Sequence, residues 1–180
     1  MATLRSKKRL PEEGRKWLAL FFLGAAVLAH GEERVLDLGK GETLRYEVLD
    51  PEDPRSARET AGQILRHLAA GSIDEAAALS NSPQRRQEVL RDYLASVGSE
   101  EFKRVFAQYL QNRIVAEIAV GPRRLIIWDL AEASHYLAGQ YYVEVDGRFL
   151  MDDVPSEGRS RLRRVLRSYR NPATPSMRTD

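Results

Sequence analysis

The dipeptide Asp146-Gly147, set between two runs of strand-forming residues, constrains the fold of this chain more than any other feature. Asp-Gly favours a two-residue type I′ turn, because both positions of that turn need a positive φ. The turn predicts a β-hairpin in which a long strand over residues 135–145 returns as a strand over 148–154. An antiparallel sheet is therefore expected in the second half of the chain.

The register of this hairpin places apolar side chains on both of its faces. A two-residue turn pairs Val143 with Leu150 on one face, and it puts Tyr142, Phe149 and Met151 on the other. A sheet with one face in water alternates cleanly between apolar and polar residues. We therefore expect helices to cover one face. The C-terminal segment, a second subunit or a ligand is expected to cover part of the other.

Helical patterns follow two short strands in the first half of the chain. Residues 34–49 indicate two strands around the turn Gly39-Lys40-Gly41, and Asp53 with Pro54 is predicted to start the first helix. Apolar residues then recur with the helical period, and glycines separate several of the segments. The predicted helices span residues 54–70, 72–79, 83–97 and 99–110.

Two strand patterns lead from the helices into the hairpin, over residues 113–120 and 123–130. Helices followed by an antiparallel sheet predict one α+β domain over residues 32–170, with a disordered tail over 171–180. Alternation in the earlier strand predicts one shared face for Ile114, Ala116, Ile118 and Val120.

The last predicted element is an amphipathic helix over residues 156–170. Its apolar stripe consists of Leu162, Val165, Leu166 and Tyr169, and arginines occupy much of the remaining surface. One interpretation is that the stripe docks on the acidic body of the same domain. The other is that the helix faces anionic lipid head groups or an acidic protein. The arginines assigned to such an anion-facing surface are Arg159, Arg163, Arg164 and Arg167.

Residues 1–31 have the pattern of a secretory signal peptide. Six basic residues precede or flank the start of an apolar run over residues 17–29, which is shorter than the roughly 20 residues of a membrane span. A buried core helix and an uncleaved anchor are the alternatives. The pattern predicts export to a bacterial periplasm or the exterior. Because the sequence contains no cysteine, neither lipoprotein attachment nor disulfides are expected.

The charge of the chain is distributed unevenly. The whole sequence has a formal net charge of +2, but residues 32–154 hold 15 basic and 22 acidic groups, whereas residues 155–180 hold seven basic and two acidic groups. The basic character therefore comes from the predicted signal and the C-terminal helix. This distribution argues against a nucleic-acid-binding body.

The sequence contains no strong catalytic or metal-binding motif. His67 and His135 lack metal-ligand spacing, and neither a nucleophile elbow nor a Gly-rich phosphate loop occurs, so no cofactor or metal is predicted. The one candidate catalytic acid is Asp129, because burial beside Trp128 would raise the pKa of its carboxyl group. The alternative is an aspartate that faces solvent at the end of a strand.

The order of elements, with the segment YYVEVDGRFLMDD over residues 141–153, resembles the cystatin-like, or nuclear transport factor two-like, superfamily. That resemblance implies a cone-shaped domain with helices packed on a curved antiparallel sheet. A weaker likeness to periplasmic phospholipid carriers of the same superfamily rests on the step Glu157-Gly158 before a final helix. The resemblance to isomerase-type members implies proton transfer by Asp129 and a tyrosine inside the cone.

These observations favour an exported, non-enzymatic domain that binds a protein partner or an apolar ligand. The alternatives are a carrier of a lipid or other apolar ligand, and an isomerase-like or dehydratase-like enzyme. A homodimer through the sheet is a separate prediction. The sheet face expected to meet the ligand or partner carries Trp128, Tyr142, Phe149 and Met151.

Overall fold

In the described part of the chain, six β-strands form one antiparallel sheet in which strands adjacent in sequence are paired. The computed structural model describes residues 31–131 and 136–171, so the predicted signal peptide, apart from Gly31, and nearly all of the predicted tail lie outside the described residues. The sheet is curved and open, with β1 and β6 at its edges. In chain order the elements are β1 (Glu32–Gly39), β2 (Glu42–Val48), α1 (Arg58–Ala70), α2 (Ile73–Ala78), α3 (Pro83–Val97), α4 (Ser99–Tyr109), β3 (Arg113–Val120), β4 (Arg123–Leu130), β5 (Tyr136–Val145), β6 (Arg148–Met151) and α5 (Glu157–Arg170).

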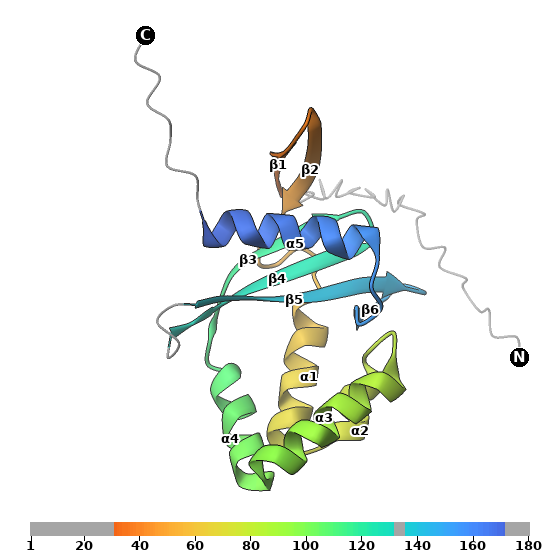
Figure 1. The fold of residues 1–180 in the computed structure, drawn as a ribbon, viewed down its shortest axis with the longest axis vertical. Helices are drawn as coiled ribbons and strands as arrows, with labels where there is room; N and C mark the ends of the chain where they lie inside the picture. Colours follow the sequence, from red (N-terminus) through yellow and green to blue (C-terminus); the bar gives the residue numbers. More distant parts are fainter. Residues whose placement is uncertain (1–30, 132–135, 172–180) are drawn as a thin grey trace, which may run out of the picture.

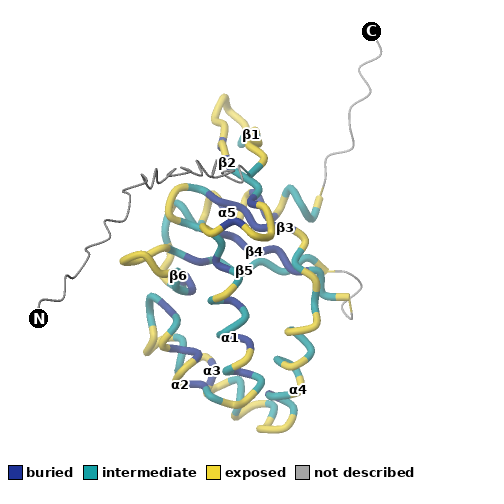
Figure 2. The backbone as a smooth tube through the Cα atoms, turned by 180° about the vertical axis from the view of Figure 1, so that it is seen from behind, coloured by how far each residue is buried: buried dark blue, intermediate teal, exposed yellow. Residues whose placement is uncertain are grey.

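Helices cover the sheet from both sides (Figure 1). The four helices α1–α4 lie on one side, where Ile64, Phe102 and Ile126 belong to a buried core. The single helix α5 crosses the other side, where a second core includes Leu125 and Leu162. Figure 2 shows buried residues on the central strands, on α5 and on the helices of the opposite side. The predicted α+β class, with helices on a curved antiparallel sheet and an Arg-rich C-terminal helix, is confirmed.

The predicted hairpin forms in the expected register. Asp146 and Gly147 have φ values of 50° and 73°, as a type I′ turn requires. Tyr142 pairs with Met151 and Val143 pairs with Leu150. The return strand ends at Met151 instead of residue 154. The chain leaves β5 after Asp152, because the backbone N–H of Asp153 donates to Asn81 and its carboxylate binds Arg86.

The first hairpin, β1–β2, extends away from the sheet (Figure 1). Only Glu47 and Val48 of β2 pair with β3. Leu44 and Tyr46 are nevertheless buried, because they join the core beneath α5. The hairpin is therefore held both by this short pairing with β3 and by apolar side chains in the core under α5.

The prediction that Ile114 shares a face with Ala116, Ile118 and Val120 is wrong. A β-bulge at Val115 shifts the register, so that Ile114 lies opposite Trp128 while Ala116 lies opposite Ile127. An extra residue in a strand reverses the side-chain alternation beyond it. Ile114 consequently packs against the core under α1–α4, whereas Ala116, Ile118 and Val120 belong to the core under α5.

The apolar stripe of α5 docks on the sheet of its own chain. Leu162, Val165 and Leu166 are at most 4 % exposed and pack over the central strands. The C-terminal segment is thus the cover of the second face. Docking requires a glycine at position 139, since a Cβ there would lie 2.6 Å from a methyl group of Leu166 and 2.9 Å from one of Leu125.

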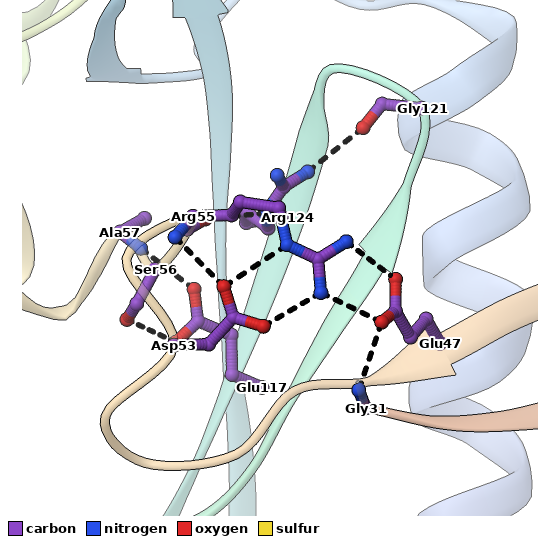
Figure 3. Close-up of polar contacts among 9 residues, drawn as sticks. All are labelled: Gly31, Glu47, Asp53, Arg55, Ser56, Ala57, Glu117, Gly121 and Arg124. Carbon is purple, nitrogen blue, oxygen red and sulfur yellow. Dashed lines mark hydrogen bonds and ion pairs between the residues drawn. The ribbon is translucent and has the colours of Figure 1, made fainter. Parts of the chain in front are cut away.

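Helix α1 begins at Arg58, so the predicted start at Asp53 and Pro54 is wrong. The acceptor at this helix start comes from β3 (Figure 3). One carboxylate oxygen of Glu117 accepts from the backbone N–H of Ala57 at 2.7 Å. The other accepts from the Ser56 hydroxyl at 2.6 Å and from Nε of Arg58 at 3.2 Å. Glu117 is completely buried, and these donors compensate its charge.

A second set of ionic contacts joins the loop before α1 to the first hairpin (Figure 3). The Arg55 guanidinium bonds to Asp53, with Nε to Oδ1 at 3.0 Å, and to Glu47 at 2.7 Å. Hydrogen bonds from Arg55 lower the pKa of both carboxyl groups. Buried Arg124 donates to the backbone carbonyls of Arg55 and Gly121, both at 2.8 Å. The loop is therefore fixed from β2 and from β4.

The close approach of α5 at Gly139 predicts opposite effects for the same substitution at two glycines. G139A forces buried leucine side chains to move, and we expect the free energy of unfolding to fall by about 1–3 kcal/mol. G62A on α1 meets only the end of the flexible Arg66 side chain and should raise stability by roughly 0.5–1 kcal/mol. Urea unfolding monitored by circular dichroism measures both. Equal effects of the two variants would contradict this account of docking.

Because Glu117 is the acceptor at the start of α1, we expect even a nearly isosteric substitution there to lower the free energy of unfolding strongly. E117Q replaces one acceptor oxygen with an NH₂ group, which leaves a buried donor unsatisfied. We expect a loss of about 1.5–3 kcal/mol in the free energy of unfolding. The matched control is E100Q, because the side chain of Glu100 is 95 % exposed, and its effect should stay within about 0.5 kcal/mol. Similar unfolding curves for the two variants would exclude the assigned role.

The contact between Asp53 and Arg55 predicts a pH-dependent stability. The pKa of Asp53 is lowered in the folded state, so its stabilisation is complete above the unfolded value of about 3.9 and is lost as the pH falls through the folded pKa. We expect D53N to cost about 1.5–3 kcal/mol at pH 7 and less below about pH 4. Urea unfolding at several pH values tests this, with D92N on the exposed side of α3 as control. A cost independent of pH would refute it.

Candidate functional site

A cleft lies where the start of α3, the loop after β6 and the first turns of α5 meet. Its volume is about 340 Å³. The loop brings residues 153–156 between the two helices, so elements far apart in sequence share one hollow. The lining residues are Arg85, Arg86, Val89, Asp153, Pro155, Ser156, Arg159, Ser160 and Arg163.

Positive charge dominates this cleft. Four of the lining side chains are arginines, and the one lining carboxylate, Asp153, is bound by Arg86, whose Nε lies 2.8 Å from Oδ2. Within residues 31–131 and 136–171, Arg85, Arg159 and Arg163 form no ion pair. An anion in the cleft would therefore meet guanidinium groups that are not already neutralised.

Arg159 is the most constrained of these arginines. Its Nε is buried, and it has no hydrogen-bond partner in the described part of the chain. Its guanidinium carbon lies 5.2 Å from the centre of the Tyr141 ring. Leaving a buried N–H without an acceptor costs free energy. The guanidinium of Arg159 therefore lines the cleft without a protein acceptor for its Nε in the described chain.

Hydrogen bonds fix the loop that forms the floor of the cleft. The Ser80 hydroxyl donates to Asp153 at 2.7 Å, and the backbone N–H of Asp153 donates to Asn81 at 2.8 Å. Ser156 caps α5, where its hydroxyl accepts from the N–H of Arg159 at 3.2 Å. The starts of α3 and α5 are thereby held at the cleft, where helix dipoles add positive potential.

The adjacent carboxylates Asp152 and Asp153 bind different partners, as expected for neighbours in an extended chain. Asp152 is buried and accepts from Asn81 at 2.9 Å and from Arg123 at 3.3 Å. Asp153 binds Arg86 and Ser80. Both carboxylates serve to hold the loop after β6.

The four arginines predicted to face an anion separate into two groups. Arg159 and Arg163 line the cleft. Arg164 lies 3.6 Å from Glu42 of β2, and Arg167 is exposed outside the cleft. Sequence reasoning missed Arg85 and Arg86. Their signal was an arginine pair in the first turn of a predicted helix, but only the fold brings that turn beside α5.

The residues predicted to form a ligand or partner face lie on the side of α1–α4. Trp128, Tyr142 and Met151 are buried there, and half-buried Phe149 packs against the same core. The Arg124 guanidinium lies 4.9 Å from the centre of the Phe149 ring. A hollow of about 200 Å³ nevertheless remains beside Trp128. Its lining consists of Leu65, Phe106, Tyr109, Trp128, Leu130, Ala138 and Gln140.

Gln140 organises the polar groups next to this hollow. Its side-chain carbonyl accepts from Nε1 of Trp128 and from the hydroxyl of Tyr142, both at 2.9 Å. Burial raises the pKa of Tyr142, so its phenol stays protonated and acts as a donor. The amide N–H groups of Gln140 have no acceptor among the described residues and can donate to a ligand.

Asp129, the candidate catalytic acid, does not line this hollow. It alternates with Trp128 and Leu130 along β4, so its side chain is on the face of the sheet that α5 covers. Its carboxylate lies 3.3 Å from the Arg113 guanidinium. The structure therefore does not bring Asp129 together with Tyr142.

The described residues contain neither a group of three potential metal ligands nor a helix long and apolar enough to cross a membrane. His67 lies on α1, and His135 is outside the described residues. Comparisons with protein-family models, with curated proteins and with solved structures find no match to this chain.

Proposed function

We propose that this chain is an exported, non-enzymatic binding domain whose arginine-lined cleft holds the anionic group of a ligand. The observation that carries the proposal is the surplus of unpaired cations in a concave site. Arg85, Arg159 and Arg163 surround the cleft without ion pairs in the described chain, and Arg86 alone is neutralised by Asp153.

Guanidinium groups suit this task because they offer several N–H donors in a fixed plane. They bind carboxylate and phosphate oxygens in pairs, and such charge-assisted hydrogen bonds are stronger than neutral ones. The starts of α3 and α5 add to the attraction for an anion. We favour a phosphate or carboxylate of a small molecule over an acidic protein, because the arginines line a hollow and not a flat surface.

The predicted signal segment supports a ligand that occurs in the periplasm or outside the cell. A carrier of a lipid or other apolar ligand is the second candidate, and the apolar hollow beside Trp128 favours it. Proton transfer by Asp129 is not part of the proposal, because that carboxylate lies on the opposite face of the sheet. A homodimer through the sheet would need surfaces other than the two faces that the helices cover.

The proposal predicts that two cleft arginines contribute strongly to anion binding. We expect the double variant R85Q/R159Q to bind inorganic phosphate at least tenfold more weakly, since each charge-assisted hydrogen bond is worth about 1.5–3 kcal/mol. Titration of the full chain followed by NMR chemical shifts measures this weak binding, at low and at moderate salt.

The matched control for this titration is R161Q. Arg161 lies on the same helix but is paired with Glu157 and does not line the cleft. It should bind phosphate like the unaltered chain. Equal affinities of the double variant and the control, with both correctly folded by circular dichroism, would refute the proposed site.

A further inference from the structure

We infer that the ligand is a single-chain anionic lipid that places its head group in the arginine cleft and its hydrocarbon chain in the apolar hollow under α4. This inference rests on the proposed function of the cleft. It joins two hollows that are formed by different elements. The arginine cleft is lined from α3 and α5, and the apolar hollow is lined from α1, α4 and the sheet.

A third hollow, here called the middle hollow, shares lining residues with both sites. It has a volume of about 230 Å³ and shares Arg86, Asp153 and Arg159 with the arginine cleft. At its other end it shares Gln140 with the apolar hollow. The three hollows therefore form a series in which each shares at least one lining residue with the next, and the last two are lined by residues of β5.

The outer side of β5 is open where this path runs. β6 pairs only with residues Tyr142–Val145. Before that point, the backbone carbonyl of Tyr141 accepts from Asp152, and that of Leu137 accepts from Arg170. Gly139 lies between them, without a side chain and without a paired strand on its outer side in the described chain. A ligand can thus approach the backbone of β5 there.

Polarity falls along this path in the way that an amphiphile requires. Four arginines and one carboxylate line the arginine cleft. Two arginines and two carboxylates line the middle hollow, and none of the described lining residues of the apolar hollow is charged. The free amide N–H groups of Gln140 stand at the boundary and suit an ester, amide or ether oxygen. Leu65, Phe106 and Trp128 then provide an apolar surface.

The size of the apolar hollow fits part of a hydrocarbon chain. An apolar protein cavity of about 150 Å³ accommodates benzene, so about 200 Å³ admits a short alkyl segment. Each methylene buried there should strengthen binding about fourfold, which corresponds to about 0.8 kcal/mol. A volume of about 200 Å³ has room for one such segment, and this favours a single-chain lipid.

The test is an affinity series of alkyl phosphates on the full chain by isothermal titration calorimetry. The probes are inorganic, butyl, hexyl and octyl phosphate, with 1-octanol as the uncharged partner of the longest one, all below their micelle concentrations. We expect affinity to rise about fourfold per methylene until the hollow is filled and then to level off. Octanol should bind much more weakly than octyl phosphate.

Two variants separate binding of the hydrocarbon chain from binding of the head group. A138F fills the apolar hollow, so octyl phosphate should bind it no better than butyl phosphate does. The control A107F makes the same change at an exposed position of α4 and should keep the full dependence on chain length. If A138F fails to fold, the alkyl phosphate series on the unaltered protein still decides the question.

The outcomes distinguish the two proposals. Phosphate binding without any dependence on chain length would overturn the lipid inference and leave the anion cleft standing. Octanol binding as tightly as octyl phosphate, with no binding of inorganic phosphate, would overturn the anion cleft and the lipid inference together. Loss of the dependence on chain length in both A138F and A107F would show that the hydrocarbon chain does not enter the hollow beside Ala138.

Discussion

The buried carboxylate of Glu117 is the interaction on which the rest of this structure depends. A fully buried charge is tolerated only when hydrogen bonds and opposite charge surround it. Glu117 satisfies that condition by accepting from the N–H of Ala57 and from the side chains of Ser56 and Arg58, which lie about 60 residues earlier in the chain. The requirement fixes both where α1 begins and how the helical side of the domain is placed on β3.

The open edge of β5 follows from this placement. With α1–α4 on one face and α5 on the other, both faces of the central strands are used for the core. Beyond Met151, the N–H of Asp152 still bonds to Tyr141 of β5. Asp153 is then held by Asn81 and Arg86, and these bonds draw the chain away from β5 to α3. The same hydrogen bonds thus create the arginine cleft and leave the adjoining strand edge accessible.

Local sequence signals predicted much of the fold but little of the site. Asp146-Gly147 specified its own turn and register, and the stripe of α5 specified its buried side, because both depend on neighbouring residues. Asp53 failed as the predicted helix start because a residue of a distant strand replaced it. The bulge at Val115 and the meeting of Arg85 with α5 likewise arise from tertiary contacts, which residue spacing does not encode.

The contrast between an acidic body and a basic C-terminal helix acquires a local meaning in the structure. Several cations of α5 are already occupied: Arg161 pairs with Glu157, Arg164 approaches Glu42, and Arg170 donates to a backbone carbonyl. Net charge therefore says little about where an anion would bind. What distinguishes the start of α5 is that Arg159 and Arg163 meet the α3 arginines in a hollow whose single carboxylate is already bound. Selectivity of the arginine cleft for an anion follows from the local lack of counter-charge. The fall in polarity from this cleft to the apolar hollow then favours a ligand whose other end is a hydrocarbon chain.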